Sequence, residues 1–150
     1  VRVPLIARWP QHIKPGRTSD HVSAFWDFVP TACQAAGLKP PKDTDGISYM
    51  ATLLGERTFS DGTERRQAKH DHLYWEFYER GGKQAVRMGD WKGVRLNVLE
   101  DPAAPIELYN LADDLGEQNN VADSNPEIVS QIAAIMAKEH VPTRRNSLQN

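Results

Sequence analysis

Two histidines separated by a single residue are the first feature of this sequence that could do chemistry. His70 and His72 precede a stretch of alternating apolar residues, and Glu76 follows on the same predicted strand face. Two imidazoles and a carboxylate on one face would suit zinc, which takes nitrogen and oxygen ligands. A two-histidine site needs at least one further ligand, and the sequence marks none clearly. We therefore favour the alternative, in which the pair begins an edge strand and is hydrogen-bonded or solvated.

Aromatic and basic residues gather in the segment that follows. Trp75 and Trp91 could stack on sugar rings, because an aromatic face suits the C–H surface of a pyranose, yet packing between a sheet and a helix is the commoner role. We expect Trp91 in the core and leave both roles open for Trp75. A basic set could attract a sulfate group, although strand charges usually form a solvated face. Its members are Arg80, Lys83, Arg87, Lys92 and Arg95.

Other kinds of site are poorly supported. No serine lies in a glycine-flanked nucleophile turn, which argues against a Ser-His-Asp triad. Gly81-Gly82 joins two strands rather than a strand and a helix, so it is not a phosphate loop. An acidic group at Asp113, Asp114 and Glu117 lacks the alternating ligands and central glycine of a calcium loop, and the start of a helix explains it better. The single cysteine, Cys33, cannot form an intramolecular disulfide.

Composition narrows the classes of function. The chain has 150 residues, 39% hydrophobic and 25% charged, which is ordinary for a globular domain. With 18 basic and 20 acidic residues its formal charge is -2, so we expect no nucleic-acid partner and no anionic membrane partner. No run approaches the length of a membrane span. The first residue is Val1 rather than methionine, and we expect the chain to be an internal part of a longer parent.

The N-terminal third predicts a strand and a helix. Residues 3–9 are apolar and end at a proline, which predicts a strand buried on both faces. Asp27 can cap a helix over residues 27–36, and Gly37 can close that helix in a left-handed conformation. Residues 47–54 can form one or two helical turns.

The remaining two thirds predict a sheet and a helix. From His72 the apolar residues alternate with a period of two, and tight turns separate four short strands, which favours an antiparallel meander. A helix at 126–138 carries an apolar stripe that can cover one face of the sheet. The fold class is therefore α+β: a four-stranded antiparallel sheet packed by a C-terminal helix. The predicted strands are 73–78, 83–88, 91–97 and 106–109.

A series of motifs resembles the late part of a sulfatase. The segment Arg2-Val3-Pro4-Leu5-Ile6-Ala7-Arg8-Trp9-Pro10 is followed by Asp27-Phe28-Val29-Pro30-Thr31 and by Asp45-Gly46 with Leu53-Leu54-Gly55. Further motifs follow in the order seen in arylsulfatase-like C-terminal subdomains, from residue 1 to about 140. They are His70-Asp71-His72-Leu73-Tyr74-Trp75-Glu76-Phe77, Gln84-Ala85-Val86-Arg87-Met88-Gly89-Asp90-Trp91-Lys92 and Glu107-Leu108-Tyr109-Asn110-Leu111.

The resemblance implies a fold like that of alkaline phosphatases and the hydrolysis of sulfate esters by a formylglycine, with calcium as the metal. The formylglycine of this family arises from a C-x-P-x-R or S-x-P-x-R motif, and Cys33 is followed by Gln34-Ala35-Ala36 instead. The family's calcium and sulfate ligands precede the R-V-P-x-I segment. Calcium and formylglycine are thus implied for the parent, and we assign no catalytic, metal-binding or cofactor-binding residue to this chain.

The resemblance also implies an organisation into parts. Residues 1–55 would end the parent's large α/β sulfatase domain, 56–69 would be a loop, 70–140 would be the C-terminal subdomain, and 141–150 would be a flexible tail. The expected function is a C-terminal sulfatase fragment that completes the fold and shapes the substrate pocket entrance but is inactive alone. Candidate substrate contacts are His70, His72, Trp75 and Arg80.

The implied partners are the parent's N-terminal catalytic domain and a sulfated small molecule or glycan. Exposed faces of the isolated chain should drive self-association. Many sulfatases are exported, which implies a periplasmic or secreted parent. Two alternatives remain: a fragment of a related phosphoester or phosphonate hydrolase, and a stand-alone carbohydrate-binding module.

Overall fold

The computed structural model describes residues 3–55, 57–58 and 64–142. The chain divides into two compact units, Val1–His70 and Asp71–Asn150. The predicted flexible tail at 141–150 lies outside the described residues except for its first two positions. No helix in the described ranges is long and apolar enough to cross a membrane.

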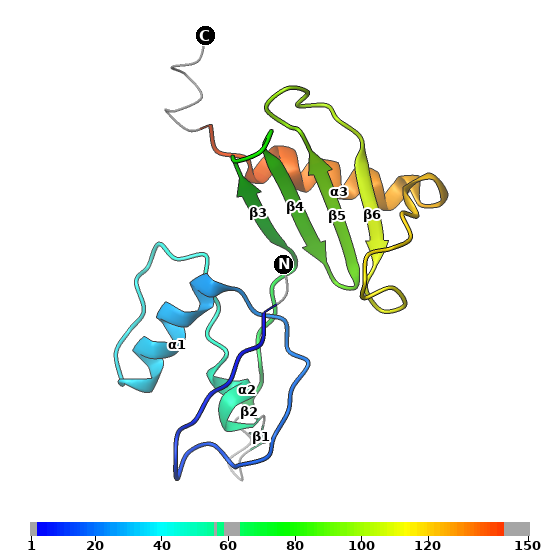
Figure 1. Ribbon diagram of the computed structural model, residues 1–150. Coiled ribbons are helices and arrows are strands. Elements are labelled where there is room, and N and C mark those ends of the chain that lie inside the picture. The colour runs from blue at the N-terminus through cyan, green and yellow to red at the C-terminus, as the bar shows by residue number, and fades with distance from the viewer. Residues whose placement is uncertain (1–2, 56, 59–63, 143–150) are drawn as a thin grey trace. The chain divides into compact units, whose positions relative to one another are not determined.

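The first unit contains the predicted helix between residues 27 and 36. A 3-10 turn, Phe25–Asp27, leads directly into α1, Phe28–Ala35 (Figure 1). Gly37 closes the helix with φ of 69°, and Leu38 N–H donates to Cys33 O at 2.8 Å. This left-handed closure confirms the predicted role of Gly37, because glycine adopts positive φ without a Cβ clash.

The predicted strand over residues 3–9 is wrong. This segment has no strand assignment, and Val3, Leu5 and Ile6 are 66%, 62% and 92% exposed instead of buried. A strand is held by hydrogen bonds to a neighbouring strand, and no described segment pairs with this one. The apolar pattern of the segment predicted a strand, but a strand also needs a neighbouring strand, and none of the described residues provides one.

The helical turns expected at 47–54 are present as α2, Met50–Leu54. Tyr49 and Met50 are buried. The chain enters this element through Gly46, where a Cβ would lie 2.3 Å from the Trp26 carbonyl oxygen. Only glycine fits such a close approach of two backbones. Within the predicted 56–69 loop, β1 (Arg57–Thr58) pairs antiparallel with β2 (Glu64–Arg65).

The second unit holds the predicted four-stranded antiparallel sheet. Its strands are β3 (Leu73–Phe77), β4 (Lys83–Met88), β5 (Trp91–Leu96) and β6 (Ile106–Asn110). They lie in the order β3-β4-β5-β6, so each strand pairs with its sequence neighbour (Figure 1). The meander is confirmed, with strand bounds within a residue or two of those predicted.

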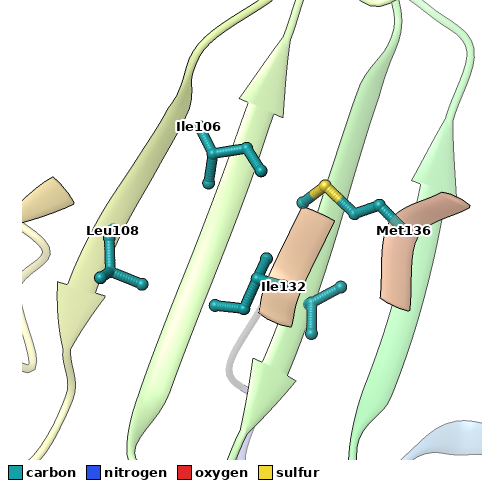
Figure 2. Close-up of a cluster of buried hydrophobic side chains, with 5 residues drawn as sticks. Ile106, Leu108, Ile132 and Met136 are labelled. Carbon is teal, nitrogen blue, oxygen red and sulfur yellow. The ribbon is translucent and has the colours of Figure 1, made fainter. Parts of the chain in front are cut away.

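Helix α3, Pro126–Glu139, follows a 3-10 turn at Ala122–Ser124 and covers one face of this sheet (Figure 1). Proline occupies the first helical turn as predicted, where its missing N–H costs no hydrogen bond. Figure 2 shows Ile106 and Leu108 on the sheet facing Ile132 and Met136. Together with Val86 these side chains form the core, and each is at most 7% exposed. The predicted apolar stripe of this helix is therefore confirmed.

The two faces of the sheet differ in what covers them. Residues in register across the sheet include Tyr74, Val86, Gly93 and Leu108, and this row lies on the face that α3 covers. A Cβ at Gly93 would lie 2.6 Å from Ile132 Cγ2. The helix therefore packs directly against the backbone of β5 at this point. Because side chains alternate along a strand, Leu73, Trp75 and Phe77 lie on the opposite face.

Candidate functional site

His70 makes its closest contact with a buried carboxylate. Its Nε2 lies 2.8 Å from Asp27 Oδ1, and the two side chains are 12% and 1% exposed. An ionised carboxylate can only accept hydrogen bonds, so Nε2 carries the proton and donates. His70, a candidate substrate contact from the sequence, therefore has its imidazole ring held in one orientation by Asp27, which lies 43 positions earlier in the chain.

Asp27 binds two further donors. Ala24 N–H donates to Oδ2 at 2.7 Å, and Ile47 N–H donates to Oδ1 at 2.8 Å. The predicted capping of α1 by this carboxylate is wrong, since Asp27 has helical angles and its side chain makes no capping bond. A capping residue needs an extended backbone. Asp27 is the last residue of the 3-10 turn before α1, so its backbone is helical and not extended. The carboxylate joins three separate segments instead.

A neighbouring hydroxyl extends this set of bonds. Thr31 Oγ1 donates to the Asp27 carbonyl oxygen at 2.6 Å and accepts from Tyr49 N–H at 3.0 Å. Thr31 and Asp27 are both buried. We call the set of Asp27, Thr31 and His70 the Asp27 node. Its buried polar atoms are paired, as burial requires if the desolvation cost is to be offset.

His72 has a different partner from His70. Its Nε2 lies 3.3 Å from Glu139 Oε1 at the end of α3. Lys138 also contacts this carboxylate at 3.2 Å. The hydrogen bond from Lys138, opposed by some desolvation and aided by His72, lowers the pKa of Glu139.

The geometry considered for zinc, with both histidines on one strand face, is not formed. Both precede β3, and each turns to the carboxylate of a different compact unit. Among the described residues, no group of three His, Cys, Asp or Glu side chains could hold a metal ion. The alternative of a hydrogen-bonded pair, favoured from the sequence, is confirmed.

Trp75 and Trp91 lie on opposite faces of the sheet. Trp91 packs against the core under α3 as predicted. Trp75 pairs with Ala85 on the other face, where Lys83 and Arg87 are its diagonal neighbours on β4. Lys83 is exposed and Arg87 is partly buried. Trp75 therefore has basic neighbours on the face that α3 leaves uncovered.

Arg80 lies in the turn between β3 and β4. It has φ of 54° and is exposed, while Gly82 N–H donates to the Glu79 carbonyl oxygen at 3.2 Å and closes the turn. The predicted hairpin at Arg80-Gly81-Gly82 is confirmed. The four candidate contacts thus lie in three different settings: His70 in the first unit, His72 and Trp75 at the start of the sheet, and Arg80 at its hairpin tip.

Sequence reasoning missed a polar cluster around Glu76. Its carboxylate accepts hydrogen bonds from Tyr74 and Tyr78 and from Gln84 Nε2 at 3.0 Å. His140 Nδ1 lies 2.5 Å from the same carboxylate. Burial alone would raise the pKa of Glu76, but these four hydrogen bonds outweigh it and lower the pKa to about 2. Burial and the bond to Glu76 raise the pKa of Tyr74.

The acidic segment near residue 114 does not begin a helix, so that prediction is wrong. Asp114 Oδ2 accepts from the N–H groups of Gln118 and Asn119 at 2.8 and 2.7 Å. The side chain thereby stabilises a turn, a role that aspartate performs as well as helix capping. Glu117 binds the largely buried Lys92 Nζ at 2.5 Å. Lys92 is therefore part of an ion pair and not one of the solvated charges expected from the sequence.

The first unit also contains an open cavity of about 560 Å³. Its lining includes Trp9, Gln34, Met50 and Leu54. The Trp9 ring stacks on His12 with centroids 4.1 Å apart, which fixes the indole at one wall. Apolar and polar groups share the lining, and no nucleophile with an adjacent base is assigned to it.

Within the described ranges, the residues do not fit the formylglycine and calcium that the sulfatase resemblance implies for a parent enzyme. Cys33 lies within α1 and lacks the proline and arginine of a formylglycine motif. The calcium expected for a parent enzyme finds no ligand cluster among the described residues.

Comparison with known proteins places the chain in a family. The family described as N-sulphoglucosamine sulphohydrolase, C-terminal, matches residues 1–145. Arylsulfatase A of Bos taurus is 31% identical in an alignment that covers 87% of this chain and 28% of that protein.

Two solved structures share the fold. One is described as a complex with its substrate D-glucosamine-2-N,6-O-disulfate, with a TM-score of 0.67, 22% identity and coverage of 95% of this chain and 28% of that one. The other is the phosphonate monoester hydrolase of Agrobacterium radiobacter, with a TM-score of 0.55, 22% identity and coverage of 82% and 26%. At these identities the likeness concerns the fold alone.

The chain spans about 28% of the length of bovine arylsulfatase A. The family match nevertheless extends over residues 1–145, which includes the first compact unit, most of the second and every element described above. This match agrees with the order of motifs and with the α+β fold. The chain therefore belongs to the sulfatase family and corresponds to the C-terminal part of a sulfatase.

Proposed function

We propose that this chain is the C-terminal portion of a sulfatase, a sulfuric ester hydrolase, and that it completes the enzyme's fold and shapes the entrance to the substrate pocket. The observation that carries the proposal is the match of residues 1–145 to a sulfatase C-terminal family. Catalysis would belong to the rest of the parent, and the isolated chain would not cleave a sulfate ester.

Exposed apolar residues of the first unit support a partner that covers them. Val3, Leu5 and Ile6 lie on a segment that pairs with no described strand, and Phe25 and Phe28 are 81% and 63% exposed. Single exposed apolar side chains are common, whereas apolar side chains that gather in one patch mark an interaction surface. In this proposal the parent's N-terminal catalytic domain covers them.

The division of labour follows from the chemistry. A covalent nucleophile and a metal ion supply the main rate terms of such hydrolysis. The formylglycine and calcium would be contributed by the parent upstream of Val1. What this chain can contribute is selectivity, through side chains that contact the substrate beyond the sulfate ester itself. The candidates are His70, His72, Trp75 and Arg80.

The proposed substrate class is a sulfated small molecule or glycan. Trp75 with Lys83 and Arg87 beside it offers an aromatic surface for a sugar ring and cations for a sulfate. A periplasmic or secreted parent would meet such substrates, and we propose that location by analogy with the family. Neither alternative is favoured: the family assignment is to sulfatases, and it spans both units rather than a separate binding module.

The first experiment compares three polypeptides with a chromogenic aryl sulfate as the substrate. They are the parent, the parent truncated after the residue before Val1, and this chain alone. The parent should hydrolyse the substrate. The truncated parent should show only background hydrolysis because its fold is incomplete, and this chain alone should do so because it lacks the nucleophile. Hydrolysis by the 150-residue chain at the parent's rate would overturn the proposal.

Substitution separates a role at the pocket entrance from a role in stability. In the parent, Arg80→Ala should raise KM for a sulfated disaccharide about tenfold, the loss of one charge-assisted hydrogen bond, with kcat for a small aryl sulfate unchanged. Lys39→Ala is the matched control, because Lys39 is also an exposed cation. Equal effects of the two variants would refute the contact assigned to Arg80.

A further inference from the structure

The paired histidines lie on either side of the boundary between the two compact units. His70 is the last residue of the first unit and Asp71 begins the second. Since the zinc site is not formed, the His70-Asp71-His72 sequence has no role assigned so far. Its contacts supply one, because each imidazole is held by a carboxylate of its own unit.

On the first side, His70 is held firmly. Its Nε2 donates to the buried Asp27 at 2.8 Å, and Asp27 is fixed in turn by the N–H groups of Ala24 and Ile47. Gln67, three residues before His70, donates to the Ser48 carbonyl oxygen at 2.8 Å and accepts from Thr52 N–H at 3.0 Å. Residues 67–70 are therefore tied to the first unit by two side chains.

On the second side, His72 and its neighbour are held by the sheet subdomain. His72 Nε2 lies 3.3 Å from Glu139 on α3, and Leu73 is buried and pairs with Arg87 in the sheet. Between these anchors Asp71 is exposed. Within the described part of the chain its carboxylate is assigned no ion pair.

We propose that the two histidines are anchors that confine bending of the inter-unit connection to Asp71. His70 locks the chain to the Asp27 node, and His72 locks it to the end of α3. When His70 and His72 are both held, few backbone dihedral angles in the connection can vary. Motion is then confined to Asp71, the residue between the two histidines. The inference concerns this connection and does not depend on sulfatase activity.

Nuclear magnetic resonance relaxation of the 150-residue chain tests the proposal. In the unmodified chain the backbone order parameter should dip at Asp71 alone, with neighbours near the value of about 0.85 typical of rigid backbone. In His70→Phe the dip should extend toward residue 67, to below about 0.6, while residues 72–77 keep their values. In His72→Phe the dip should extend toward residue 73, with residues 67–70 unchanged.

Conservative variants keep the test decisive if a phenylalanine variant fails to fold. His70→Gln retains an N–H donor near the position of Nε2, so it should keep the order parameters of residues 67–70. Glu139→Gln should loosen His72 without affecting His70. The proposal is overturned if both histidine variants loosen the same residues, or if the order parameter does not dip at Asp71 in the unmodified chain.

Discussion

Asp27 shows how one carboxylate can organise a segment poor in regular structure. Its side chain is fully buried, and its three donors come from the turn before α1, from Ile47 and from His70. Hydrogen bonds to charged groups contribute more than neutral ones, and a buried charge without partners is strongly destabilising. The first unit therefore depends on this side chain for contacts that strands or long helices provide elsewhere.

Glu76 predicts a dependence of stability on pH. Hydrogen bonding lowers its pKa from 4.5 to about 2 on folding. Its contribution to the free energy of unfolding is therefore complete above the unfolded value of 4.5 and is lost as the pH falls toward 2. We expect Glu76→Gln to flatten the decline in stability across this range, as measured by urea denaturation at a series of pH values.

Glu127→Gln is the control for this experiment, because Glu127 is an exposed carboxylate in the first turn of α3. Its substitution should leave the slope of stability against pH almost unchanged. Identical slopes for the unmodified chain and Glu76→Gln would show that the hydrogen bonds of Glu76 do not persist in solution.

The candidate site was only partly predictable at this scale. The sequence singled out His70 and His72, because two histidines separated by one residue could bind a metal ion or contact a substrate. It gave no sign of Asp27 as the partner of His70, since 43 residues separate them and only tertiary folding brings them together. At Glu76 the same reason applies only to His140, which lies 64 residues away; Tyr74, Tyr78 and Gln84 lie within eight residues of Glu76.

Among the elements, α3 and the sheet hold each other in place. Ile132 is fully buried between them, and truncating a buried isoleucine to alanine costs about 2–5 kcal/mol. We expect Ile132→Ala to lower the free energy of unfolding of the second unit by that amount in chemical denaturation. Gln131→Ala, at an exposed position of the same helix, should change it by less than about 0.5 kcal/mol.

A substitution on the sheet side, at Gly93, tests the same packing between α3 and the sheet. A Cβ at Gly93 would press against Ile132 Cγ2, so Gly93→Ala should also destabilise the second unit. Ile132→Val keeps Cγ2 but removes Cδ1, which would lie 3.1 Å from the same Cβ, so it should recover only part of the loss in the double variant. Strictly additive effects of the two changes would place the strain elsewhere.

The elements of the second unit were easier to predict than those of the first. Alternation of Leu73, Trp75 and Phe77 and the turn at Gly81-Gly82 are local signals, and antiparallel strands close in sequence can satisfy one another. Residues 3–9 carry an equally apolar pattern, but a strand also needs a partner. The sequence could not reveal that no described segment pairs with it.

For the molecule as a whole, the uncovered surfaces predict self-association. Leu5 and Ile6 are 62% and 92% exposed on a segment that pairs with no described strand, and free backbone groups of this kind can pair with another chain. We expect the isolated chain to form dimers or larger oligomers at micromolar concentration in light scattering. The double variant Leu5→Ser/Ile6→Ser should shift it toward monomer.

Leu115→Ser is the matched control for this prediction. Leu115 is 59% exposed, yet it lies in a turn of the second unit and not on the unpaired segment. Its substitution should leave the oligomeric state unchanged. A monodisperse monomer of the unmodified chain would contradict the prediction, and so would equal shifts in the two variants.

The packing of α3 against the sheet also has a consequence during synthesis. The ribosome produces all four strands before it produces Ile132 and Met136, which cover their apolar face. Val86, Ile106 and Leu108 must therefore remain uncovered on the nascent chain until the helix emerges from the exit tunnel. A sheet that is covered only when α3 is complete is exposed to misassembly throughout that interval. Chaperones that bind apolar nascent strands should accordingly engage this polypeptide between translation of β6 and release of α3.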